Sequence, residues 1–214
     1  MEPARKRRFI KPVVFALCLV PFTRLLYRAA TDGLGANPID AITDQTGTWT
    51  LRFLAITLAV TPLRRLSGRS ELVPYRRMLG LFAFFHGCLH FLTYMVLDQF
   101  FAFDEIVKDV AKRPYITVGF TAFVLMIPLA ATSTAGMIRR LGGRRWRNLH
   151  RLVYVSAAGG VVHYWWLVKA DLQRPQIYAL IVDALLGFRA VAGLAARRRR
   201  ASAALPADGD TAAT

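Results

Sequence analysis

The residues in this chain best suited to chemistry are four histidines, each within or at the edge of a long apolar run: His86, His90, His150 and His163. An ionisable side chain at membrane depth is costly, so it is a candidate for function. Neutral imidazole is a common metal ligand and a frequent axial ligand of haem iron. A single intramembrane histidine is more often a packing or hydrogen-bonding residue, so the spacing of the four has to decide between the two interpretations.

The spacing favours a pair made by His90 and His163. His90 follows Arg77 by 13 residues and His163 follows Arg151 by 12. At about 1.5 Å of helical rise per residue, both imidazoles then lie roughly 18 to 20 Å from the same membrane edge. Two imidazoles at one depth on neighbouring parallel helices predict an iron held between them, as in a haem protein. The glycines Gly87, Gly159 and Gly160 are expected to make room there for a porphyrin face.

The other two histidines have less certain roles. His150 marks a second level, but 13 residues leave it roughly 140° around an ideal helix from His163. No histidine faces that level, and Arg76 or Arg77 stands there instead, either to pair with haem propionates or to anchor the helix. His86, one turn from His90, has two readings: a direct role, or a hydrogen bond to a propionate or a neighbouring helix.

The elements that must position these residues are predicted to be transmembrane helices. The chain has 214 residues, of which 55% are apolar. Apolar runs of bilayer length predict six spans in an all-α, polytopic membrane bundle. The spans are 12–29, 48–63, 78–97, 115–132, 150–168 and 176–195. The transmembrane domain is expected over residues 12–196, between a basic N-terminus (1–11) and a disordered tail (197–214).

The charges predict an orientation. There are 29 Lys and Arg against 13 Asp and Glu, a net charge of +16, and 20 of the 29 fall in segments on one side of the six spans. Translocated loops are depleted in Lys and Arg, so that side is expected to be cytoplasmic and to hold both termini. The basic clumps alternate with apolar runs, which favours topology signals and contact with membrane lipid over a nucleic-acid site.

Two absences narrow the chemistry. Two cysteines, both in apolar runs, are too few for a disulfide framework or a Cys-based zinc or iron-sulfur site. The sequence also has no GxGxxG or GxxxxGK[ST] motif. We therefore expect no nucleotide-binding domain within the chain.

Several motifs occur in an order that resembles one family. They lie at 37–40 (NPID), 46–49 (TGTW), 58–65 (LAVTPLRR), 76–81 (RRMLGL), 89–94 (LHFLTY), 112–119 (KRPYITVG), 128–134 (PLAATST) and 149–154 (LHRLVY). Over roughly residues 12–190, the chain is similar to the MsrQ family, also called YedZ. These are haem-binding membrane subunits of bacterial periplasmic methionine sulfoxide reductase systems, within the ferric reductase-like transmembrane superfamily.

The resemblance implies a six-helix cytochrome of the bacterial inner membrane that binds one or two b-type haems, with FMN as a further cofactor. Its haem-associated histidines correspond to His90, His150 and His163, and it gives no support to His86 as a ligand. It implies electron transfer to MsrP, a periplasmic molybdopterin enzyme that repairs oxidised methionine in proteins, rather than catalysis by this chain. The quinone pool or a soluble flavin reductase is the implied donor.

Two other classes of function are compatible with the residues alone. One is a stand-alone ferric or quinone reductase without a protein client. The other is a proton channel or transporter in which the histidines titrate and hold no iron.

Overall fold

The computed structural model describes residues 3–203, and all regular structure in that range is helical. The long helices are α1 (Pro3–Ala30), α2 (Pro38–Ser67), α3 (Val73–Leu92), α5 (Pro114–Ala131), α8 (Leu152–Leu167) and α9 (Gln173–Ala203). The shorter elements are the 3-10 turn η1 (Ser70–Leu72), the π-helical turn η2 (Thr93–Asp98), α4 (Phe103–Lys112), α6 (Ala135–Leu141) and α7 (Gly143–Leu149). The expected all-α fold is confirmed over the described residues.

Each expected span falls on one of the six long helices, although the bounds differ. Four segments are long and apolar enough to cross a membrane: Phe9–Ala30, Ser70–Asp98, Pro114–Ala131 and Gln173–Arg199. The other two helices fall short, since α8 has only 16 residues and α2 carries Arg52 among several threonines. The structure thus supports a membrane protein with several apolar helices, while the count of six spans stays a prediction.

Local sequence signals account for where the helices begin and end. Helix α2 starts at Pro38, and the side chain of its N-cap residue Asn37 accepts a hydrogen bond from the backbone of Asp40 at 3.3 Å. The helix stops at Gly68, whose φ of 69° is accessible to glycine at little cost. Helix α5 likewise begins at a proline, Pro114. These residues set where α2 begins and ends and where α5 begins, and α2 and α5 are the helices that pack on the histidine-bearing helices α3 and α8.

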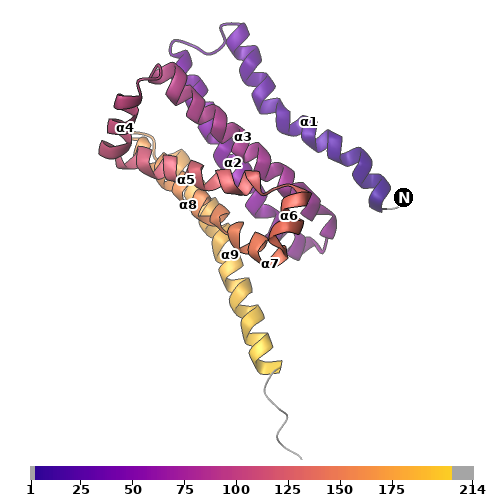
Figure 1. The fold of residues 1–214 in the computed structure, drawn as a ribbon. Coiled ribbons are helices and arrows are strands. Elements are labelled where there is room, and N and C mark those ends of the chain that lie inside the picture. Colours follow the sequence, from indigo (N-terminus) through magenta and orange to yellow (C-terminus); the bar gives the residue numbers. More distant parts are fainter. Residues whose placement is uncertain (1–2, 204–214) are drawn as a thin grey trace, which may run out of the picture.

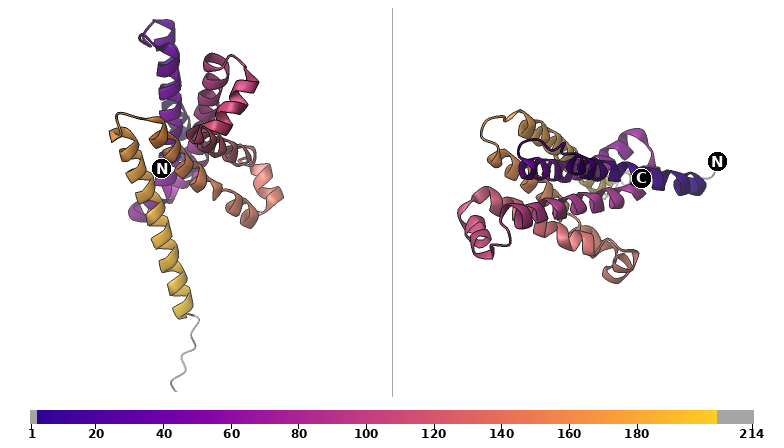
Figure 2. Two further views of the ribbon diagram at one scale, coloured as in Figure 1. Left: turned by 90° about the vertical axis from the view of Figure 1, so that its left-hand side faces the viewer. Right: turned by 90° about the horizontal axis from the view of Figure 1, so that it is seen from above.

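The bundle is organised as two closely packed helix pairs. Helix α2 packs mainly on α3, and α5 packs mainly on α8, while α9 lies against both α2 and α8. Figures 1 and 2 show α1 at the periphery, where its main contacts are with α2 and α3. Small and apolar side chains fill the centre, among them Leu58, Ala83, Ala157 and Val182, each at most 1% exposed.

Four buried threonine hydroxyls are satisfied by the backbone one turn earlier, whereas the buried hydroxyl of Ser156 has no partner among the described residues. The threonines at positions 46, 57, 93 and 132 each donate to the carbonyl oxygen four residues earlier, at 2.6–2.8 Å. Such bonds let a polar side chain sit where no water is available. The threonine-rich face of α2 can therefore line the interior of the bundle.

The two ends of the bundle differ in their charges. The turn between α2 and α3 and the short helices α6 and α7 lie at one end, and α9 extends beyond them (Figure 1). This α6–α7 end collects most of the arginines of the connecting segments. The opposite end, the α4 end, holds Asp104, Glu105 and Asp109.

The chain termini differ in part from expectation. Helix α1 already starts at Pro3, and α9 continues to Ala203, beyond the boundary expected at residue 196. Residues 204–214 of the expected disordered tail lie outside the described residues, as do residues 1–2.

Candidate functional site

His90 and His163 face each other across the middle of the bundle. His90 lies near the end of α3 and His163 near the end of α8, both toward the α4 end. Their ring centroids are 6.1 Å apart, and the ring planes are inclined by 76°. Both residues are partly buried. The structure thus brings the two imidazoles together, while their depth in a membrane stays a prediction.

One nitrogen of each imidazole is held by the backbone of a neighbouring helix. His90 Nδ1 lies 3.0 Å from the carbonyl oxygen of Thr43 on α2, and His163 Nδ1 lies 2.7 Å from the carbonyl oxygen of Tyr115 on α5. A carbonyl oxygen only accepts, so each Nδ1 carries the proton and donates. Each Nε2 is then the nitrogen left with a free lone pair, the tautomer that a metal-ligating histidine needs.

Each imidazole also lies directly on a glycine of the helix that holds it. A Cβ added at Gly47 would come within 2.9 Å of the His90 ring, and one added at Gly119 within 2.5 Å of His163 Nδ1. Both distances are too short for any side chain. The sequence analysis missed these two positions, although each lies within a motif that carried the family resemblance, TGTW and KRPYITVG.

The two halves of the site repeat one arrangement. In each half, the carbonyl that accepts from Nδ1 lies four residues before the glycine beneath the ring: Thr43 before Gly47, and Tyr115 before Gly119. Residues four apart lie on one face of a helix. One face of α2 therefore supplies both the carbonyl acceptor and the space for His90 of α3. One face of α5 supplies the same two features for His163 of α8.

This arrangement fits a haem iron held between the two rings. Imidazoles that bind one metal from opposite sides, with metal–nitrogen bonds of about 2 Å, have ring centres roughly 6 Å apart. The observed 6.1 Å agrees with that requirement. The fixed tautomers and the glycines beneath the rings meet the two other needs of such a ligand pair, orientation and room.

The glycines expected to make room for a porphyrin have a different role. A Cβ at Gly159 would lie 3.1 Å from the Cβ of Ala122, and one at Gly87 would lie 3.4 Å from the ring of Phe123. A Cβ at Gly160 would contact Leu51 at 3.5 Å. These glycines allow neighbouring helices to approach closely. The space beside the imidazoles comes from Gly47 and Gly119 instead.

His150 lies at a second level, at the α6–α7 end. It follows α7 and precedes α8, which begins only at Leu152, so it is not on one continuous helix with His163. The angle of roughly 140° expected for a continuous helix therefore does not apply. The His150 ring stacks on Trp146 at 3.8 Å, and its Nδ1 lies 3.0 Å from the Trp146 carbonyl oxygen. Its Nε2 is buried with no partner among the described residues.

The arginines near this second level differ in burial. Arg76 is half-buried and close enough to His150 to act on it electrostatically, whereas Arg77 is exposed. A further arginine missed in the sequence, Arg189 of α9, is also half-buried. It donates to the carbonyl oxygens of Leu58 and Leu185 and lies 5.6 Å from the centre of the Tyr154 ring.

His86 lies between the two levels in an aromatic environment. It is 2% exposed and has the rings of Phe53, Phe85 and Trp49 within 5.1–6.5 Å. Its Nδ1 is bonded to the Phe82 carbonyl oxygen of its own helix at 3.0 Å. Its Nε2 has no partner among the described residues. The hydrogen bond to a neighbouring helix that the sequence allowed is therefore absent here.

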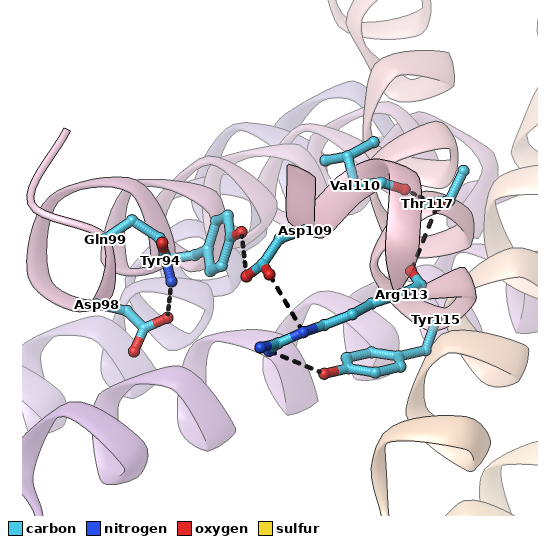
Figure 3. A network of polar contacts seen from close by, with 8 residues as sticks. All are labelled: Tyr94, Asp98, Gln99, Asp109, Val110, Arg113, Tyr115 and Thr117. Carbon is cyan, nitrogen blue, oxygen red and sulfur yellow. Dashed lines mark hydrogen bonds and ion pairs between the residues drawn. The ribbon is translucent and has the colours of Figure 1, made fainter. Parts of the chain in front are cut away.

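A polar network at the α4 end joins residues of η2, α4 and the start of α5 (Figure 3). Asp109 of α4 accepts from the Tyr94 hydroxyl at 3.3 Å and pairs with Arg113 Nε at 3.2 Å. Arg113 Nη1 also lies 3.5 Å from the Tyr115 hydroxyl. Bonding to that phenol and the charge of Asp109 raise the pKa of Arg113, so the guanidinium stays positively charged.

Comparison with known proteins identifies relatives along most of the chain. A family model described as "Ferric reductase like transmembrane component" matches residues 46–161, which include Gly47, His90, Gly119 and His150. No solved structure matches.

Three relatives carry the name "Protein-methionine-sulfoxide reductase heme-binding subunit MsrQ". The protein from Herminiimonas arsenicoxydans is 60% identical over 83% of this chain and 82% of the relative. The one from Ralstonia nicotianae is 56% identical over 88% of each chain. The one from Rhodospirillum rubrum is 53% identical over 89% of this chain and 91% of the relative.

Proposed function

This chain belongs to the MsrQ family within the ferric reductase-like transmembrane proteins, and from that premise we propose that it is a b-type cytochrome subunit that passes electrons to a periplasmic methionine sulfoxide reductase. The enzyme that it serves would be MsrP, the molybdopterin reductase. In this proposal the chain carries electrons and does not itself bind oxidised methionine.

The observation that carries the proposal is the geometry of His90 and His163. Two imidazoles lie 6.1 Å apart, and because each Nδ1 proton is bonded to a carbonyl oxygen, each Nε2 keeps its lone pair for a metal ion. Bound there, a haem would supply reversible one-electron chemistry of its iron.

The protein residues have three tasks in this proposal. His90 and His163 would hold the haem iron through their Nε2 atoms, while the carbonyls of Thr43 and Tyr115 keep the rings from turning. Phe91, which stacks on Phe123 at 5.2 Å, belongs to the apolar packing beside His90 that keeps water away. A dry and rigid site limits the reorganisation that accompanies electron transfer.

The proposed orientation places the α4 end on the periplasmic side of the inner membrane. Six spans then leave both termini in the cytoplasm. The arginine-rich α6–α7 end also faces the cytoplasm, because loops rich in Lys and Arg are retained on that side. The His90–His163 pair would lie nearer the periplasm, on the side where MsrP docks. Electrons would arrive from the quinone pool or from a soluble flavin reductase.

The second level supports a proposal of its own. His150 has a buried Nε2 without a partner, and Arg76 is nearby. We propose that this level binds a second haem or the FMN that the resemblance implies, and that Arg76 and Arg77 would pair with the charged groups of that cofactor. Arg189 is a further cation at that level.

The main test is the visible spectrum of the purified protein. The wild type is expected to show a reduced b-type haem spectrum, and His90→Ala or His163→Ala should each remove most of the haem. Cys88→Ala, on the same helix as His90, is the matched control and should keep it. A colourless wild type would instead favour a channel with titrating histidines, and unchanged spectra in both histidine variants would reject the ligand assignment.

A second test concerns His150. His150→Ala should change the haem content or the rate at which a donor reduces the protein, while the haem of the His90–His163 pair stays detectable. Pyridine haemochrome quantitation against protein, with flavin analysis of the same preparation, measures both. Loss of all haem in His150→Ala would contradict the proposal that the protein has two separate cofactor sites.

A further inference from the structure

We propose that Asp109 is a positioning residue for the histidine pair: its carboxylate ties the segment after His90 to the segment that holds His163. The proposal rests on the proposed function, because its main measurement is made on the bound haem. Asp109 lies outside the motifs that carry the family resemblance, although its partners Tyr94 and Arg113 lie within two of them.

The two oxygens of Asp109 bind different parts of the chain (Figure 3). Oδ2 accepts from the Tyr94 hydroxyl at 3.3 Å, and Oδ1 pairs with Arg113 Nε at 3.2 Å. The Asp109 side chain is only 17% exposed. Its carboxylate therefore bridges the end of one helix pair, α2–α3, and the start of the other, α5–α8.

The link from Asp109 to His163 passes through the first turn of α5. Arg113 immediately precedes α5, and its guanidinium also reaches the hydroxyl of Tyr115. The carbonyl oxygen of that same Tyr115 accepts from His163 Nδ1 at 2.7 Å. The hydroxyl of Thr117, two residues after Tyr115, donates a hydrogen bond to the carbonyl oxygen of Val110 on α4. Two contacts, one from Arg113 and one with α4, thus hold the turn that orients His163.

The link from Asp109 to His90 is shorter. Tyr94 lies four residues after His90, in the π-helical turn η2 that continues α3. A π-helical turn is a rare and strained departure from the α-helix, and such turns occur often at functional sites. Here η2 brings the Tyr94 hydroxyl to Asp109. The same carboxylate consequently restrains the helix end next to His90.

Other acidic residues of α4 do not share this geometry. Glu105 pairs with Lys108 at 2.7 Å, but both side chains are more than half exposed. An exposed pair of this kind contributes little to stability. Asp104 is exposed on the same helix and has no hydrogen bond from its side chain among the described residues. Asp104 is therefore the natural control for Asp109.

The physical consequence is an effect on the reduction potential. A ligand imidazole that donates a firm Nδ1 hydrogen bond is more basic, and this stabilises the oxidised iron. Loosening the turn at Tyr115 weakens that bond, so it should raise the potential. A direct effect of charge has a different pattern, because loss of the Asp109 anion would raise the potential whereas loss of the Arg113 cation would lower it.

The experiment compares midpoint potentials of the purified, haem-loaded protein. Asp109→Asn and Arg113→Gln should both raise the midpoint potential of the His90–His163 haem. A tenfold change in the reduction equilibrium corresponds to a shift on the order of 59 mV for a one-electron couple, and we expect a shift of that size. Tyr94→Phe, which changes no charge, should shift it in the same direction. Asp104→Asn should leave it unchanged, and Asp109→Glu should restore part of the shift.

Two results would overturn the proposal. If Asp109→Asn and Arg113→Gln shift the potential in opposite directions, only their charges act on the haem. If both variants have the same potential as Asp104→Asn, Asp109 is not linked to the histidines. Where Asp109→Asn fails to fold, Tyr94→Phe decides, and an unchanged potential in it counts against the proposal. A wild type without haem would instead contradict the proposed function.

Discussion

At the scale of single residues, the site depends on what lies behind each imidazole. His90 and His163 are each held from behind by a carbonyl oxygen, and each lies on a glycine. A histidine that binds iron must keep one tautomer and one ring orientation, and these contacts supply both. Gly47 and Gly119 are therefore as much a part of the site as the histidines.

The closest of these contacts leads to a prediction. Gly119→Ala places a Cβ only 2.5 Å from His163 Nδ1. This is too close for two atoms that are not bonded, so the ring must turn or shift. We expect this variant to lose much of its haem, and Gly47→Ala, with its contact of 2.9 Å, to lose less. Haem content per protein and the reduced spectrum measure the effect.

The matched control is Gly187→Ala in α9, where an added Cβ meets nothing within 4 Å. Alanine favours a helix over glycine by about 1 kcal/mol, so the control should keep its haem and be at least as stable as the wild type. Equal haem content in Gly119→Ala and Gly187→Ala would mean that the His163 ring does not lie as described.

At the scale of elements, the two helix pairs set the distance between the histidines. Helices α5 and α8 approach closely because Gly159 faces Ala122, where an added Cβ would lie 3.1 Å from the alanine Cβ. Small residues at helix crossings allow such approach in membranes. The carbonyl of Tyr115 reaches His163 only while this crossing is tight.

Widening that crossing should therefore damage both stability and the site. Gly159→Leu forces α5 and α8 apart, and overpacking of this kind costs about 1–3 kcal/mol. We expect a lower melting temperature in detergent together with a loss of haem. Gly193→Leu is the control, since nothing lies within 4 Å of its added Cβ. A stable, fully haem-loaded Gly159→Leu protein would show that the crossing does not constrain the site.

At the scale of the whole molecule, the bundle has one end rich in arginine and one end with acidic α4. In the part of the chain that the structure describes, both ion pairs lie at the α4 end, Lys108 with Glu105 and Arg113 with Asp109. The arginines of α6 and α7 have no carboxylate partner in those residues and are free to face water or lipid headgroups. This asymmetry is what orients the chain in the proposed topology.

Labelling of single cysteines checks that topology. In spheroplasts, a membrane-impermeant maleimide should label Asp104→Cys on α4 and should leave Arg144→Cys on α7 unlabelled until the membrane is opened. Both positions are exposed, so accessibility within the protein does not limit either reaction. The native Cys18 and Cys88 lie inside helices and serve as the background. The reverse pattern would place the α4 end in the cytoplasm and refute the proposed orientation.

The helical fold and the family could be read from the sequence alone, and the spacing of the histidines predicted that His90 and His163 lie together. Apolar runs and basic clumps follow from the cost of burying charge in a bilayer, and this cost acts locally along the chain. The rise of a helix is constant, so distances from a common edge place two histidines at one depth. The motifs that carried the resemblance were also enough to identify the relatives.

The residues that surround those histidines became visible only in the three-dimensional structure. Gly47 and Gly119, the carbonyls of Thr43 and Tyr115, and the contacts of Asp109 all join different helices. The break before α8, which frees His150 from the angle of a continuous helix, also appears only there. The physical reason is that the crossing and axial register of two helices depend on how all their side chains pack together, and no pattern within one helix specifies them.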